Sequence, residues 1–165
     1  MPAFAFTRQP DALAWFGTGR GGAVLASEQA RVSQALTSST PGPWLWVSPD
    51  GVEPAPAGDI PPMRGVRLHA RSGAQRLTGQ VRCGLPLPLP TEAVAVIVVQ
   101  HLAGISAEPG VRLEEGARGM VPGGRLWLVA NRQLPYEEVL DARFASVRIV
   151  AQRDGFKVVE AVKAR

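Results

Sequence analysis

The second half of the chain alternates between short apolar runs and amphipathic segments. Residues 93–99 (AVAVIVV) are apolar at every position, as in a central parallel strand that is buried on both faces. Residues 107–120 are amphipathic, and Pro109 is suited to the first turn of a helix. The predicted elements, in chain order, are a strand at 93–99, a helix at 107–120 that VPGG (121–124) ends, a strand at 125–130, a helix at 134–144, and a hairpin at 145–162 that turns at Asp154 and Gly155. This order is typical of the second half of an α/β sheet.

The first half begins with one clear helical pattern. Residues 23–36 place apolar residues at helical spacing and polar residues elsewhere, which predicts an amphipathic helix. The apolar positions are Leu25, Val32 and Leu36, and the polar positions are Glu28, Gln29 and Arg31.

Strand signals follow, with a proline-rich interruption. Residues 43–47 (PWLWV) are apolar and aromatic between turn residues, so they predict a short buried strand. Prolines recur through residues 48–63, and because proline removes a helix donor we expect no ordinary helix there. Residues 65–70 and 76–83 flank a connection that is too short for a parallel crossover, so they predict antiparallel pairing, or one strand plus an edge.

Length and composition limit the class of protein. A chain of 165 residues with 45% hydrophobic residues is long enough for one domain and too short for two. The longest apolar run, residues 93–99, is far shorter than the about 20 residues that cross a bilayer, and the first ten residues lack a signal pattern. We therefore expect a soluble cytoplasmic protein with no membrane partner. Cys83, with only His69 and His101 as company, predicts no disulfide and no metal site.

The charge balance raises nucleic acid as a partner. The formal net charge is +4, and the cations are arginines apart from Lys157 and Lys163. The arginines are scattered from Arg8 to Arg165 rather than gathered in runs, so a solvated arginine-rich surface explains them at least as well. Nucleic-acid binding stays an open alternative that we do not favour.

A glycine motif and the tryptophans have simpler interpretations than a ligand site. Gly17, Gly19 and Gly22 match G-x-G-x-x-G, but a dinucleotide loop needs a preceding strand, so we interpret them as a turn or a helix opening. The large aromatic residues are expected to pack in the core, and any that are exposed would mark an association surface. They are Trp15, Phe16, Trp44, Trp46, Trp127 and Phe144.

Two stretches resemble a known family. LPLPLPTEAVAVIVVQHLAG (85–104), followed by LEEGARGMVPGGRLWLVA (113–130), resembles the second half of Rossmann-like (class I) S-adenosylmethionine-dependent methyltransferases. The continuation through FKVVEA (156–161) is similar to the end of ribosomal RNA guanine methyltransferases, and VPGGRLWL (121–128) is the most specific piece. The resemblance implies an α/β, reduced Rossmann-like methyltransferase fold, with a mixed sheet and a C-terminal antiparallel hairpin. Residues 1–165 then form one methyltransferase-like domain, made of a helical segment (10–36), a shortened first half of the sheet (43–84) and an α/β half (85–165).

The same resemblance implies positions for S-adenosylmethionine. In that family the first strand ends in an acid and a glycine-rich turn, and the second strand ends in an acid that holds the ribose hydroxyls. This chain has SPDG (48–51) after the first strand, His69 and Arg71 at the second, and Cys83 at the position that commonly pairs with adenine. Because these departures leave the cofactor anchors weak, binding of S-adenosylmethionine is doubtful. The candidate cofactor residues are Val47, Ser48, Asp50, Gly51, His69 and Cys83.

Candidate catalytic and substrate residues follow the two central strands. Gln100 and His101 come directly after the run at 93–99, where open α/β sheets place their ligands. A histidine there can act as a base near neutral pH, but no partner carboxylate is visible nearby in the sequence. The guanine methyltransferases carry an aromatic NPPF motif at this place, and QHLAG (100–104) can hydrogen-bond a substrate but cannot stack one. Asn131 and Arg132 follow the next strand and are candidate walls of a substrate pocket.

Three functions remain open. The first is a methyltransferase-like protein with a degenerate cofactor site that works by binding or assembly, and the second is an active S-adenosylmethionine-dependent methyltransferase on RNA or a small molecule. The third is an arginine-rich nucleic-acid-binding module. An open sheet edge in the shortened first half makes a homodimer a plausible partner arrangement.

Overall fold

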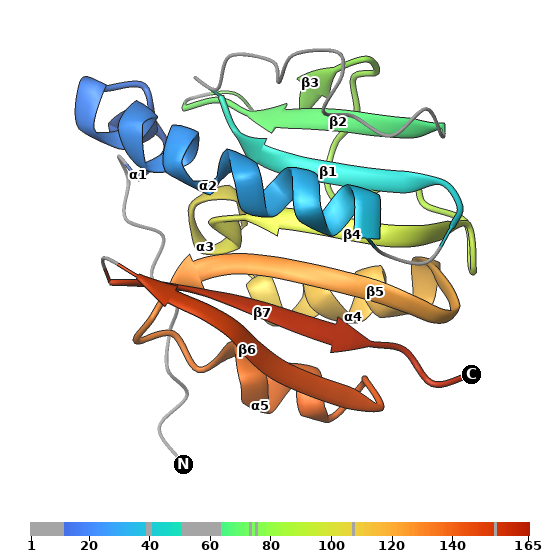
Figure 1. Cartoon of the computed structure of the whole chain (residues 1–165). Helices are drawn as coiled ribbons and strands as arrows, with labels where there is room; N and C mark the ends of the chain where they lie inside the picture. The colour runs from blue at the N-terminus through green and yellow to red at the C-terminus, as the bar shows by residue number, and fades with distance from the viewer. Residues whose placement is uncertain are drawn as a thin grey trace.

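A single seven-stranded mixed sheet forms the centre of the computed structural model (Figure 1), which describes residues 12–38, 41–50, 64–72, 74, 76–106, 108–153 and 155–165. The strand order is β3-β2-β1-β4-β5-β7-β6. The parallel strands are β1 (Trp44–Pro49), β2 (Gly65–Ala70), β4 (Val94–Gln100) and β5 (Met120–Asn131). The antiparallel strands are β3 (Thr78–Gly79) beside β2, β7 (Phe156–Val162) beside β5, and β6 (Ser146–Arg153) at the edge.

Helices cover both faces of this sheet. Helix α2 (Gly19–Ser38) follows the short α1 (Ala12–Phe16) and lies across one face, where Val32 and Leu36 pack with Trp46 and Val98. The other face carries α3 (Leu102–Ile105), α4 (Pro109–Gly119) and α5 (Tyr136–Asp141). The fold is therefore three-layered, with α2 on one side and α3, α4 and α5 on the other.

The central strands confirm the sequence predictions. Every residue of β4 is buried, as expected for a parallel strand with covered faces. The predicted strand at 43–47 corresponds to β1, and the predicted helix at 23–36 lies inside α2. The mixed α/β sheet and its C-terminal hairpin are confirmed as well.

The boundary between α4 and β5 differs from the prediction. Helix α4 ends at Gly119 as expected, but β5 begins at once at Met120 instead of at residue 125. Residues 121–124 bulge opposite Ala95, because the register passes from Val94–Met120 directly to Val96–Arg125. Gly124 permits this, since a Cβ at that position would lie 3.0 Å from the carbonyl oxygen of Ala95.

Other predictions are partly right or shorter in the structure. The antiparallel pairing of residues 65–70 with 76–83 is confirmed, although β3 holds only two residues. The predicted helix at 134–144 is α5 alone, which covers residues 136–141. The interpretation of the glycine motif as a turn or helix opening agrees with the structure, because a helix (α1) and not a strand precedes it.

Some predictions lie outside the described residues. They concern most of the proline-rich stretch (51–63), including Gly51, and the turn residue Asp154. Among the described helices, none has both the length and the apolar character needed to span a membrane.

Candidate functional site

A chain of buried polar side chains lies where β4 ends. The indole Nε1 of Trp46 donates to Gln100 Oε1 at 2.7 Å, and Gln100 Nε2 donates to Glu28 Oε2 at 2.8 Å. His101 Nε2 lies 2.9 Å from Glu28 Oε1 and 3.1 Å from Oε2. We call these four residues the end network. Gln100 is fully buried, Glu28 is 8% exposed and His101 is 7% exposed, so the carboxylate is held by protein donors instead of water.

The donors and acceptors of the end network have one consistent assignment. An indole nitrogen only donates, so the oxygen of Gln100 must face Trp46 and its amide N–H must face Glu28. An ionised carboxylate only accepts, so Nε2 of His101 carries the proton that points at Glu28. In a neutral ring Nδ1 then remains as a lone-pair acceptor.

The backbone of His101 is held in an uncommon conformation. Its φ of 57° and ψ of 50° lie in the left-handed region, which costs an L-residue about 1–2 kcal/mol. The backbone N–H of His101 donates to Val129 O at 2.8 Å, and its carbonyl accepts from Gly104 N at 3.0 Å. The strand end, the neighbouring β5 and the short α3 together fix the direction of the histidine ring.

A pocket opens beside His101 at the carboxyl ends of β4 and β5. Its volume is about 350 Å³, and α1, α3 and the start of β7 close it. Its aromatic walls are Trp15, Phe16, Tyr136 and Phe156. The His101 ring centroid lies 4.5 Å from that of Phe16 and 5.2 Å from that of Phe156. We call this cavity the end pocket.

These aromatic walls supply the stacking surfaces that QHLAG (100–104) itself lacks. That stretch has no aromatic ring, but α1 and β7 bring Phe16 and Phe156 against its histidine. Trp15 is 40% exposed, so its predicted core role is wrong, and it stands at the pocket instead. Burial raises the pKa of Tyr136 to about 12, which keeps this pocket wall neutral.

Two of the candidate cofactor residues come together on one face of the sheet. Ser48 and His69 are register partners on β1 and β2, and Ser48 Oγ lies 3.4 Å from His69 Nδ1. Burial lowers the pKa of His69, and the nearby Arg67 guanidinium lowers it further. The Arg67 guanidinium stacks over the Trp46 ring, with its Cζ 3.8 Å from the ring centroid.

Asp50 is engaged by a cation. Its Oδ2 accepts a hydrogen bond from Arg71 Nε at 2.6 Å. Asp50 follows β1 and Arg71 follows β2, so this ion pair joins the ends of the two strands. Among the described residues, this carboxylate at the ends of β1 and β2 is thus already paired with a guanidinium.

Val47 and Cys83 belong to the opposite face. Side chains alternate along a strand, and Val47 packs in the core on the α4 side while Ser48 faces the α2 side. Cys83 packs against the same α4-side core and pairs through its backbone with Leu77. Burial raises the pKa of the Cys83 thiol, so it is a poor nucleophile. The sheet therefore separates these two candidates from Ser48 and His69.

Asn131 and Arg132 lie at the carboxyl end of β5. Asn131 lines the end pocket, and its Oδ1 accepts from the backbone N–H of Gln133 at 3.0 Å. Arg132 is exposed beside it, and its backbone N–H donates to Gly155 O at 2.8 Å. The residues after β4 and β5 thus meet at one end of the sheet.

Glu28 was not among the predicted site residues, and its assignment off the apolar stripe of the helix was wrong, because its side chain is buried against His101. No carboxylate lies near His101 in the sequence, as stated above, but α2 brings Glu28 from 73 positions away into contact with its ring. A signal existed, because Glu28 stands three residues after Leu25 and four before Val32, a spacing that puts all three on one helix face. A charged residue on a buried stripe needs a partner.

Comparison with known proteins shows a similarity to one family over part of the chain. The model of the methyltransferase small domain family matches residues 111–160. The ribosomal RNA small subunit methyltransferase C of Alcanivorax borkumensis is 44% identical over 50 residues, which cover 30% of this chain and 15% of that protein. The protein of the same name from Serratia proteamaculans is 51% identical over 43 residues, covering 26% of this chain and 12% of that one. Residues 111–160 are thus similar to the methyltransferase small domain family.

Solved methyltransferase structures share the fold. The Thermus thermophilus 16S rRNA N2 G1207 methyltransferase, solved with AdoMet and guanosine, superposes with a TM-score of 0.56 at 21% identity, over 82% of this chain and 39% of that one. A putative methyltransferase solved with the Haloferax volcanii Trm112 activator gives a TM-score of 0.54 at 14% identity, over 93% of this chain and 97% of the other. The chain spans only a small part of its curated relatives, and the family match from α4 to β7 leaves out Ser48, His69 and the end network.

Proposed function

We propose that this chain, which has a methyltransferase-like fold, is a binding protein whose cofactor position is closed by its own side chains. The observation that carries the proposal is the 2.6 Å contact between Arg71 Nε and Asp50 Oδ2. A ribose with two hydroxyls is held best by a free carboxylate, which accepts two hydrogen bonds. The described end of β2 instead presents His69 and the cationic Arg71, so these residues do not fit the adenosyl group of S-adenosylmethionine.

The state of Gln100 supports the same proposal. Both ends of its amide are used inside the end network, by Trp46 and by Glu28. One N–H and one lone pair of the amide are therefore occupied before a substrate amine arrives. The mechanism implied by the guanine methyltransferases, in which a side-chain amide after the fourth strand accepts the target amine, is not supported here.

An active methyltransferase is the second candidate, and one observation favours it. The Arg71 and Asp50 side chains are 69% and 38% exposed. An ion pair with that exposure contributes about 0–1 kcal/mol, so a ligand that binds well can displace Arg71 from the carboxylate. The two candidates therefore differ in one measurable quantity, the affinity for the cofactor.

Thermal denaturation with S-adenosylmethionine and with S-adenosylhomocysteine tests the proposal. We expect no change in Tm for either compound, in the original chain and in Asp50→Ala. An occupied site at 100 times Kd would add about 2.7 kcal/mol, enough to raise Tm by several degrees. A saturable rise in the original chain that Asp50→Ala abolishes would establish the active alternative instead.

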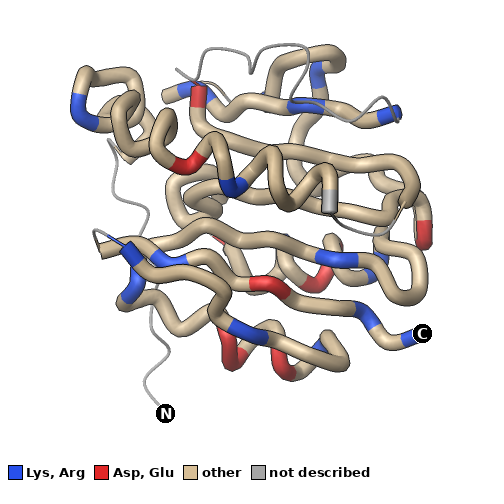
Figure 2. Tube along the Cα trace, viewed as in Figure 1, with Lys and Arg blue, Asp and Glu red and all other residues tan. Residues whose placement is uncertain are grey.

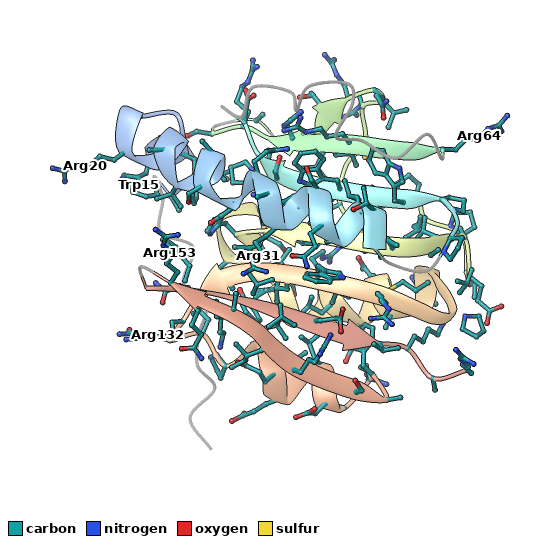
Figure 3. The ribbon with its side chains drawn as sticks, in the orientation of Figure 1. Trp15, Arg20, Arg31, Arg64, Arg132 and Arg153 are labelled. Atoms are coloured by element: carbon teal, nitrogen blue, oxygen red, sulfur yellow. The ribbon has the colours of Figure 1, made fainter. Side chains whose placement is uncertain are left out.

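RNA is the ligand that we propose for the binding role. Figure 3 shows Trp15, Arg20, Arg132 and Arg153 at the side of the molecule where β4 and β5 end, and Arg31 further along α2 in front of the sheet. Arg64 lies on the opposite side. Elsewhere the Lys and Arg residues are spread along the chain (Figure 2). Cations and an exposed indole are the groups that bind a single-stranded backbone and stack on its bases. The curated relatives, which are named as ribosomal RNA methyltransferases, support the same ligand class.

Fluorescence anisotropy with a labelled single-stranded RNA tests this partner. The triple variant Arg20→Gln, Arg31→Gln, Arg132→Gln should lose about tenfold or more in affinity, and its affinity should fall less steeply with salt. Arg64→Gln is the matched control, because it removes an exposed cation at the far side. If Arg64→Gln lowers the RNA affinity as much as one of the three substitutions does alone, the effect comes from net charge and not from a binding surface.

A homodimer and a cytoplasmic location complete the proposal. Strand β6 is a sheet edge with many exposed positions, and its Ile149 is 43% exposed. An open edge of this length supports edge-to-edge pairing between two copies. Sedimentation at several concentrations tests the dimer, and Ile149→Lys should shift any dimer toward monomer.

A further inference from the structure

We propose that His101 is the specificity-determining residue of the end pocket, and that it selects planar heteroaromatic rings that present an N–H or NH₂ donor. This inference rests on the proposed binding function, since it names the ligand chemistry of that pocket. It concerns the side-chain acceptor His101 Nδ1, which has no hydrogen-bond partner among the described residues, in a ring that lines the pocket.

The acceptor character of Nδ1 is set by the carboxylate of Glu28 on α2. Trp46 can only donate, so the Gln100 amide must present its N–H to Glu28, and the ionised carboxylate of Glu28 can only accept from His101 Nε2. A protonated Nε2 leaves Nδ1 as the acceptor of a neutral ring. Glu28 is thus a positioning residue, because it sets the tautomer of His101 and does not itself line the end pocket.

The shape of the pocket fits a flat ring. Its volume of about 350 Å³ is at the small end of the range for ligand pockets. The rings of Phe16 and Phe156 both contact the His101 ring. A ligand that reaches Nδ1 therefore lies among aromatic faces and edges. Such walls bind any planar ring, and only the histidine distinguishes ring edges that donate from edges that do not.

The size of the discrimination follows from the burial of His101. A ligand that fills the pocket without a donor removes water from Nδ1 and leaves that atom unpaired. Sites built to pair with a polar group reject the isostere that lacks it far better than they reject a change in size. We expect a ring with a donor to bind about tenfold or more tightly than its isostere.

Indole and benzofuran are the probes, because they share a shape and differ in the N–H. Titration of the ¹⁵N-labelled chain with each compound gives the two Kd values, and ¹⁵N shifts of the histidine ring give its tautomer. We expect a proton on Nε2 of His101 in the free chain and an affinity ratio of about ten or more in favour of indole.

Two variants and one control separate the role of the acceptor from simple packing. In Glu28→Gln the new side-chain oxygen must serve Gln100, so its NH₂ faces His101 Nε2 and the ring proton moves to Nδ1; indole should then lose its advantage. In His101→Phe the ring is kept and the acceptor is removed, so both probes should bind alike. Glu108→Gln removes an exposed carboxylate far from the network's hydrogen bonds and should keep the original ratio.

Three outcomes would overturn the inference. They are a proton on Nδ1 in the free original chain, equal binding of the two probes to it, and an indole advantage that survives in His101→Phe. The tautomer of the original chain decides the matter even if Glu28→Gln does not fold. Neither probe carries adenosine or phosphate, so these results stand apart from the cofactor and RNA titrations that test the proposed function.

Discussion

Glu28 and His101 are 73 positions apart in the chain, and their side chains meet at 2.9 Å between Oε1 and Nε2. The contact joins the middle of α2 to the end of β4, so it ties a helix on one face of the sheet to the edge where the pocket opens. Burying a carboxylate and an imidazole to this degree costs stability unless they are hydrogen-bonded, and this contact pairs the two. Stability and binding therefore depend on the same network.

Glu28→Ala should destabilise the chain by about 2–5 kcal/mol, because it leaves the amide of Gln100 and Nε2 of His101 without an acceptor. Urea denaturation of the variant and the original chain measures the difference in the free energy of unfolding. Glu108→Ala is the control, since that side chain is 70% exposed and its change should stay within about 0.5 kcal/mol. A loss below about 1 kcal/mol for Glu28→Ala would mean that water replaces the carboxylate.

The sheet could be predicted from the sequence because its signals are local. β4 is a continuous apolar run, Pro109 begins α4, and the hairpin of β6 and β7 has a tight turn. The early start of β5 could not be predicted in the same way, because residues 121–124 form a bulge that depends on the close approach of Ala95 on the neighbouring strand. Nothing in VPGG alone indicates that approach.

The location of the candidate site could be predicted from the sequence, but the side chains that its residues contact could not. Gln100, His101 and Asn131 meet at one end of the sheet because parallel strands that are neighbours end together. The groups that give this end its chemistry, Glu28 and Phe156, come from a helix and a strand far away along the chain. A periodic pattern shows which face a residue occupies, but not which distant side chain it meets.

His69 should make the stability of the chain fall as the pH is lowered. Burial and the charge of Arg67 place its pKa in the folded chain below the ordinary value of 6.5, while Arg71 acts in the same direction and Asp50 opposes it. The unfolded chain then binds more protons at mildly acidic pH, so the contribution is complete above about pH 6.5 and shrinks as the pH falls below it.

His69→Gln removes this titration and leaves the other groups in place. Urea denaturation at about pH 8 and about pH 5 should show the original chain losing more stability than the variant between the two values. Parallel pH dependences for the two proteins would contradict the prediction, and a steeper loss in the variant would reverse its sign.

Tyr136 should act in the alkaline range with the opposite sign. Burial raises its pKa in the folded chain to about 12, against 10.0 when unperturbed, although a backbone contact with Ala103 opposes the shift. A raised pKa means that the stability is complete below about pH 10 and is lost as the pH rises toward 12. The loss at about pH 11.5 should be about 2 kcal/mol.

The phenolate absorbance measures this directly, because Tyr136 is the only tyrosine in the chain. Its transition in the folded protein should lie near pH 12, and Tyr136→Phe should lack the loss of stability between about pH 9 and 11.5. A transition near pH 10 in a chain that is still folded would show that the phenol is in contact with water.

Lys157 and Glu137 provide a test of how a buried charge is stabilised beside the end pocket. Lys157 is 4% exposed, and its Nζ lies 2.7 Å from each carboxylate oxygen of Glu137 and 2.6 Å from the carbonyl oxygen of Leu134. Glu137→Ala leaves an ammonium buried with one neutral acceptor, so it should cost about 2–4 kcal/mol. Lys157→Met fills a similar volume without a charge. Water can then hydrate Glu137, which is 27% exposed. The free energy of unfolding should therefore fall by only about 1 kcal/mol. Denaturation of both variants should therefore rank Glu137→Ala as the more damaging change, and equal losses would show that the pair acts only through packing.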